Sequence, residues 1–93
     1  MFNIPRPNVI ESDEGFSIEV LGRTGLKYSQ GGRILMLDSE ILAGPSEIVI
    51  YKSSIVGWNP PHDQEILDDK LRDEIIDNIK RAFHFRNIEM EII

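Results

Sequence analysis

The sequence predicts an α+β fold in which a mostly antiparallel, curved sheet of about five to six strands accompanies one long amphipathic helix and a C-terminal strand. Short stretches of alternating apolar and polar residues, separated by glycine-containing turns, fill residues 16–58. A single 3.6-residue apolar period covers residues 68–86, and a period of two returns at residues 88–93. Because 93 residues suit one domain, we expect residues 1–93 to share one core.

Composition narrows the function classes. Sixteen acidic against ten basic residues give a net charge of −6, which disfavours a nucleic-acid binder because phosphate contacts need clustered Lys and Arg. The absence of cysteine excludes disulfides, thiolate metal sites and a cysteine nucleophile. Residues 1–9 lack the pattern of a secretory signal, and no stretch approaches the ~20 apolar residues that span a bilayer. We therefore expect a cytoplasmic protein without membrane contact.

The first fifteen residues are expected to form an extended or poorly ordered arm. Pro5 and Pro7 restrict the backbone, and residues 11–15 (Glu-Ser-Asp-Glu-Gly) have the composition of a polar turn. Apolar residues then alternate with polar ones at residues 16–20. This alternation predicts the first strand.

Turn residues divide the following region into successive strands. A second strand is predicted at residues 26–29 and a third at residues 33–38, joined by a hairpin turn with two adjacent glycines. A break at residues 43–46 (Ala-Gly-Pro-Ser) precedes a fourth strand at residues 47–52, which is rich in β-branched side chains. Three alternatives stay open for residues 53–58: they continue this strand, bend, or add a short strand.

A proline-containing loop leads into the helix. Residues 59–67 begin with Asn-Pro-Pro-His-Asp, which is incompatible with regular structure. Asp68 or Asp69 can cap the helix predicted at residues 68–86, and Asn87 can adopt the left-handed conformation that ends it. The apolar stripe of this helix consists of Leu71, Ile75, Ile79, Ala82 and Phe83.

Two of the predicted strands are apolar on both faces. In the third strand Ile34 and Met36 oppose Leu35 and Leu37, and the fourth strand shows the same pattern. One helix covers only one face of a sheet. The second apolar face therefore needs curling of the sheet, the N-terminal arm or another chain to cover it.

No catalytic or metal-binding pattern stands out. The glycines of residues 22–32 are flanked by strands and read as turn residues, since no helix follows to form a phosphate cradle. His62 and His84 lack a spacing typical of metal ligands, and no Gly-x-Ser-x-Gly elbow is present. We therefore expect no enzymatic activity, no metal and no cofactor.

Two clusters are candidates for partner binding. Asp69, Asp73 and Asp77 recur every four residues and form an acidic ridge, which either docks on a basic cleft or is a solvated face neutralised by neighbouring cations. Trp58, beside two prolines, either anchors an interface or plugs the core, and we favour the core. Tyr51 and Asp63 complete the candidate partner-binding residues.

The order of the motifs resembles the immunity protein 74 family, small bacterial proteins encoded beside polymorphic toxins. The resemblance covers residues 16–93 and does not involve residues 1–15. It rests on the ordered segments Ile18–Tyr28, Gly31–Arg33, Asp38–Ser46, Ile48–Tyr51, Ser53–Ile55, Trp58–Pro61, Ile75–Ala82 and Ile88–Ile92.

The resemblance implies an antitoxin that binds and blocks a cognate toxin domain by protein–protein contact, without turnover or cofactor. If the toxin is a nuclease, its basic cleft would attract a protein of net charge −6. The alternatives from other classes are a self-associating structural domain that forms a homodimer and a small hydrolase built on carboxylates or His62. The toxin, its chemistry and the contact surface stay open at this point.

Overall fold

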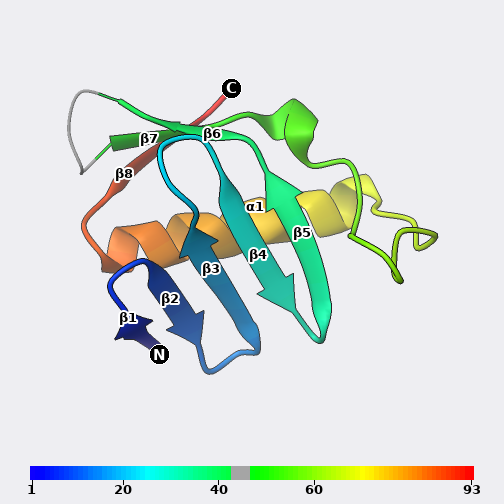
Figure 1. The fold of residues 1–93 in the computed structure, drawn as a ribbon, viewed down its shortest axis with the longest axis horizontal. Coiled ribbons are helices and arrows are strands. Elements are labelled where there is room, and N and C mark those ends of the chain that lie inside the picture. The colour runs from blue at the N-terminus through cyan, green and yellow to red at the C-terminus, as the bar shows by residue number, and fades with distance from the viewer. Residues whose placement is uncertain (43–46) are drawn as a thin grey trace.

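The computed structural model of the chain describes residues 1–42 and 47–93. It confirms the α+β class and divides the strands between a five-stranded antiparallel sheet and a three-stranded sheet (Figure 1). The large sheet has the order β1-β2-β3-β4-β5 and the small sheet the order β6-β7-β8. The elements are β1 (Phe2–Arg6), β2 (Val9–Ser12), β3 (Phe16–Val20), β4 (Leu26–Gln30), β5 (Arg33–Leu37), β6 (Ser39–Ile41), β7 (Glu47–Ile50), the 3-10 helix η1 (Lys52–Ser54), α1 (Asp69–Phe85) and β8 (Glu89–Ile92).

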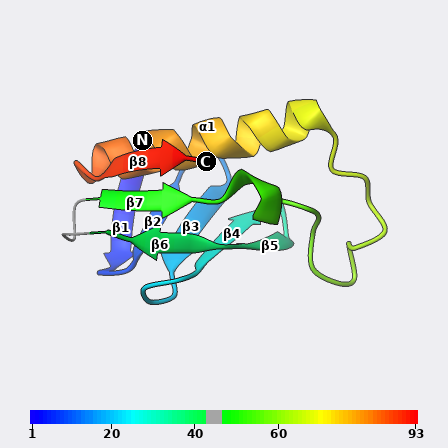
Figure 2. The ribbon, with the colours of Figure 1, turned by 90° about the horizontal axis from the view of Figure 1, so that it is seen from above.

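Helix α1, the large sheet and the small sheet together enclose the core. Helix α1 runs across one face of the large sheet, whose other face is open (Figure 1). The small sheet lies along one side of this pair, with β8 next to α1 (Figure 2). Strands β7 and β8 pair in parallel, because the chain between them crosses over through α1.

The N-terminal segment is part of the large sheet, which corrects the expected extended or poorly ordered arm of residues 1–15. Strand β1 pairs with β2, and β2 pairs with β3 through Val9 and Ile10, both of which are buried. Pro5 lies in the edge strand β1 and Pro7 in the following turn. At neither position would a backbone N–H have to donate a hydrogen bond to a neighbouring strand, so both prolines are compatible with strand pairing.

The hairpin between β4 and β5 forms as the sequence predicts. Gly31 and Gly32 have φ angles of 58° and 81°, and Gln30 pairs directly with Arg33. Two consecutive positive φ angles are typical of the tight turns whose twist matches that of the flanking strands. The break predicted at residues 43–46 lies outside the described residues.

Helix α1 begins and ends with the predicted caps. The Asp68 side chain accepts a hydrogen bond of 2.8 Å from the Leu71 N–H, and Asn87 adopts a φ of 58° beyond the last turn. The buried residues of the helix are Ile75, Ile76, Asn78, Ile79, Ala82 and Phe83. The predicted apolar stripe therefore faces the core, and Asn78 adds a polar residue to it.

The two strands with apolar residues on both faces have different surroundings. In β5, Leu35 and Leu37 are buried, whereas Ile34 and Met36 on the open face are 36% and 43% exposed. In β7, three consecutive apolar residues including Val49 are all buried. The fourth predicted strand ends at Ile50, and the chain then bends through η1 instead of forming another strand.

Candidate functional site

Trp58 belongs to the core. Its side chain is 6% exposed and stacks on Tyr28 with 6.4 Å between the ring centroids. The next residue, Asn59, donates a backbone hydrogen bond of 2.7 Å to the Ile34 carbonyl at the edge of β5. Trp58 and Asn59 therefore hold the loop between η1 and α1 against the large sheet. Little of the Trp58 indole is left exposed for contact with a partner.

The acidic residues of α1 lie among cations. Asp69, Asp73 and Asp77 are all exposed on the solvent side of the helix. Asp69 forms an ion pair of 2.6 Å with Arg72. Asp77 lies 3.4 Å from Arg81 Nε, an ion pair whose geometry does not make a hydrogen bond. Such helical pairs reduce the negative potential of the ridge.

Asp63 is exposed in the loop that precedes α1. This loop is attached to the large sheet by Glu65, which forms an ion pair of 2.7 Å with Arg33 Nε and a hydrogen bond of 2.7 Å with His62 Nδ1. The hydrogen bond from Arg33, followed by that from His62, lowers the pKa of Glu65. His62 therefore takes part in a hydrogen-bonded surface cluster that links the loop to Arg33 at the start of β5.

Tyr51 lies at the border of the small sheet. Its hydroxyl donates a hydrogen bond of 2.8 Å to a carboxylate oxygen of Glu40 on β6. This hydrogen bond is the main cause of a raised pKa of Tyr51. Tyr51 is thus a predicted partner-binding residue that is hydrogen-bonded to a side chain of the small sheet.

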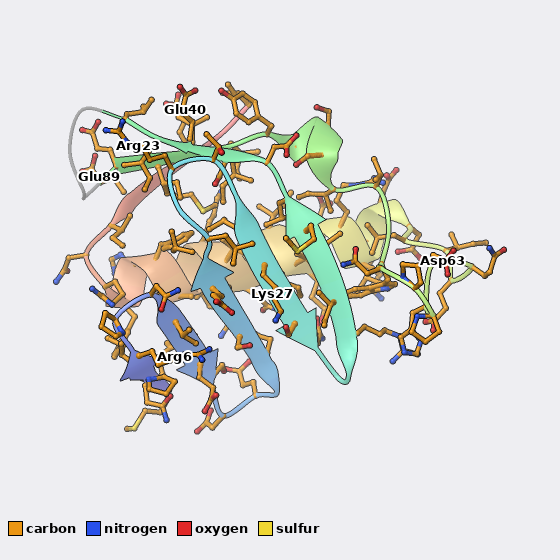
Figure 3. The ribbon with its side chains drawn as sticks, in the orientation of Figure 1. Arg6, Arg23, Lys27, Glu40, Asp63 and Glu89 are labelled. Carbon is orange, nitrogen blue, oxygen red and sulfur yellow. The ribbon has the colours of Figure 1, made fainter. Side chains whose placement is uncertain are left out.

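The outer face of the small sheet carries four exposed glutamates, a set that the sequence alone does not group together. The strand register places Glu47 of β7 directly beside Glu89 of β8, and Val49 lies between Glu40 and Glu91. Figure 3 shows Glu40 and Glu89 at the small sheet, well away from Asp63. In the sequence, only the alternation of apolar residues with glutamate at residues 88–92 indicates part of this face.

A hollow in the described surface lies at the C-terminal end of α1. It is a wide, open groove of about 1000 Å³ whose lining includes Phe2, His84, Phe85, Ile88 and Met90. Its lining contains no Ser, Thr or Cys side chain, and His84 is exposed. Within residues 1–42 and 47–93, no group of three or more His, Asp or Glu side chains is placed to hold a metal ion.

Residues 17–93 match the family described as immunity protein 74. The chain belongs to this family. No curated protein and no solved structure matches the chain. The immunity protein 74 match begins in β3 and includes α1 and the whole small sheet, whereas β1 and β2 precede it. Membership in the immunity protein 74 family identifies the chain as an immunity protein. In the described part of this immunity protein, no helix is both long and apolar enough to cross a membrane.

Proposed function

We propose that the protein is an antitoxin that binds a cognate polymorphic toxin domain and blocks it by protein–protein contact, without catalysis or a cofactor. The observation that carries this proposal is the match of residues 17–93 to the immunity protein 74 family. An immunity protein of this kind acts in the cytoplasm of the cell that makes the toxin.

The surface chemistry supports a protein partner with a basic face. The net charge of −6 accelerates encounter with a cationic protein, for which a nuclease with a positive cleft is the leading example. The outer face of the small sheet adds a local surplus of carboxylates to this overall charge. The groove at the C-terminal end of α1, by contrast, is lined by no Ser, Thr or Cys side chain that could act as a nucleophile.

The test uses the toxin domain encoded beside this gene. Its activity is titrated with the purified protein, and we expect inhibition that saturates at a fixed molar ratio. An unrelated toxin domain serves as the control and should keep its activity. Absence of inhibition of the neighbouring toxin contradicts the proposal, and progressive inactivation by substoichiometric amounts of protein indicates an enzyme instead.

A second candidate function is a self-associating structural domain. It is favoured by Ile34 and Met36, which lie next to each other in β5 on the open face of the large sheet and are 36% and 43% exposed. A homodimer through this face predicts a concentration-dependent mass in sedimentation that Met36→Lys abolishes. A monomer at all concentrations contradicts this candidate.

A further inference from the structure

We propose that the outer face of the small sheet, formed by Glu40, Glu47, Glu89 and Glu91 around Val49, is the surface on which a basic face of the cognate toxin domain docks. This inference rests on the proposed antitoxin function and assigns it to one surface. The partner chemistry that it requires is a cluster of Lys and Arg side chains around a small apolar contact.

The strand register creates this surface. Glu40, Val49 and Glu91 occupy one row across β6, β7 and β8, and Glu47 and Glu89 form the adjacent pair two residues along the same face. All four glutamates are exposed, whereas Ile48 and Ile50, which alternate with Glu47 and Val49 along β7, belong to the core cluster. Since side chains alternate along a strand, no glutamate of this set can turn inward without shifting the register.

The glutamates of this face lack the ion pairs that several other acids of the chain form. Glu14 pairs with Arg81, Glu19 lies near Arg6 and Lys27, and Glu65 binds Arg33. Within residues 1–42 and 47–93, no Lys or Arg nitrogen lies within 4.0 Å of a carboxylate of the four glutamates.

Two basic residues lie in the segments that flank the face. Arg23 approaches β6 through its carbonyl oxygen, which accepts a hydrogen bond of 3.1 Å from the Ile41 N–H. Lys52 follows β7 in η1. Neither side chain forms an ion pair with the described carboxylates, although Figure 3 shows Arg23 between Glu40 and Glu89. Four carboxylates against these two cations leave the face with an excess of negative charge in the free protein.

Like charges directly opposite each other destabilise a sheet, and the register puts Glu47 beside Glu89. A second copy of the chain would bring glutamates against glutamates, and nucleic acid would bring phosphates against them. Both occupants increase the repulsion. A cationic protein surface relieves it, so charge complementarity selects a basic partner.

Leu42 provides the apolar contact beside the face. Its side chain is 42% exposed and its backbone N–H donates a hydrogen bond of 3.2 Å to the Glu47 carbonyl, whereas Val49, which is 6% exposed, offers a partner little surface. At the border, the hydrogen bond between Tyr51 and Glu40 holds both side chains in place. An exposed apolar side chain beside polar groups and an oriented tyrosine is typical of protein-binding surfaces. Strands also hold these side chains more rigidly than loops would.

The test measures the affinity of the toxin domain encoded beside this gene for the full chain and two charge-reversed variants. In the first variant, Glu89→Lys and Glu91→Lys invert part of the proposed face. In the matched control, Asp63→Lys and Glu74→Lys make the same change in net charge at exposed positions elsewhere. We expect the first variant to bind about tenfold more weakly or worse and the control to stay within about threefold.

A neutral variant separates binding from folding. Glu47→Gln removes the repulsion with Glu89 at nearly constant shape, so it should raise the midpoint of thermal unfolding while it weakens toxin binding. If Glu47 had a purely structural role, the midpoint of thermal unfolding and the affinity for the toxin would change in the same direction. Circular dichroism checks that each variant is folded.

The outcomes distinguish this inference from the function on which it rests. If the wild-type protein inhibits the toxin and the Glu89→Lys/Glu91→Lys and Glu47→Gln variants bind as tightly as it does, the surface assignment is wrong and the antitoxin function stands. If the control variant loses binding and the face variants keep it, the toxin docks on the loop and helix instead. If the wild-type protein neither binds nor inhibits the toxin, the antitoxin function itself fails.

Discussion

Asn78 donates a hydrogen bond of 2.9 Å from its side-chain amide to the hydroxyl of Tyr28, which is fully buried between α1 and the large sheet. The Tyr28 hydroxyl donates in turn to Gln30 Oε1 at 2.7 Å, and Asn78 Oδ1 accepts from Arg81 at 2.6 Å. Arg81 also binds both carboxylate oxygens of Glu14. This chain of hydrogen bonds ties the helix to β4 and to the β2–β3 turn.

Removing the Asn78 amide should destabilise the fold. Asn78→Ala deprives the Tyr28 hydroxyl of a donor and leaves a small void, so we expect a loss of about 1–3 kcal/mol in the free energy of unfolding. Asp73→Ala, at an exposed position on the same helix, is the control and should change it by less than about 0.5 kcal/mol. Urea denaturation measures both, and equal effects of the two substitutions would contradict the role assigned to Asn78.

Alkaline pH should weaken the fold through Tyr28. Burial raises the pKa of Tyr28 to about 12, although the hydrogen bond from Asn78 opposes the shift. In the unfolded chain a tyrosine titrates near 10, so the folded state binds this proton more tightly. The contribution to stability is complete below about pH 10 and is lost as the pH rises toward 12, by up to about 2–3 kcal/mol.

The measurement is urea unfolding from pH 8 to pH 11 with Tyr28→Phe as the control, since this variant has no hydroxyl to titrate. Absorbance titration in a Tyr51→Phe background follows the Tyr28 phenol alone, because the chain has two tyrosines. If wild type and Tyr28→Phe lose stability equally over this range, Tyr28 is not the group responsible.

Features that depend on local sequence were predictable. The helix cap at Asp68, the left-handed Asn87 and the Gly31–Gly32 turn follow from the conformational preferences of single residues. Trp58 also lies in the core, as favoured from its size and from its being the only tryptophan. In each case a few neighbouring residues suffice to determine the structure.

Features that depend on pairing between distant segments were not predictable. Glu47 and Glu89 become neighbours only because α1 returns the chain to the side of β7. Asn78 resembles any polar helix residue until the fold brings the Tyr28 hydroxyl to it. Pro5 and Pro7 suggested an arm because they restrict the backbone, but Pro5 lies in the edge strand β1 and Pro7 in the turn that follows it. The acidic ridge of α1 was visible in the sequence, whereas the unpaired acidic face was not.

The N-terminal strand should contribute to stability. Phe2 is half-buried and packs against Phe16 and Phe85 with ring centroids 5.9 and 5.5 Å apart. We expect Phe2→Ala to lower the free energy of unfolding by about 1–2 kcal/mol, less than a fully buried phenylalanine would because part of the ring is already in water. Ile4→Ala in the same strand is the control and should have a smaller effect. A disordered arm would make both substitutions neutral.

Two buried serines should respond in opposite ways to the loss of their hydroxyl groups. Ser12 Oγ accepts a hydrogen bond of 3.0 Å from the Glu14 N–H, whereas Ser39 Oγ has no hydrogen-bond partner within residues 1–42 and 47–93. Ser12→Ala should therefore cost about 1 kcal/mol in stability, because it leaves the turn N–H unpaired. Ser39→Ala removes a desolvated polar atom and should be neutral or stabilise by up to about 1 kcal/mol. Thermal and urea unfolding of the two variants, compared side by side, measure the difference. If Ser39→Ala lowered the free energy of unfolding as much as Ser12→Ala, the Ser39 hydroxyl would have to form a hydrogen bond in solution. The small sheet would then be stabilised at Ser39 by this hydrogen bond in addition to strand pairing and apolar contact.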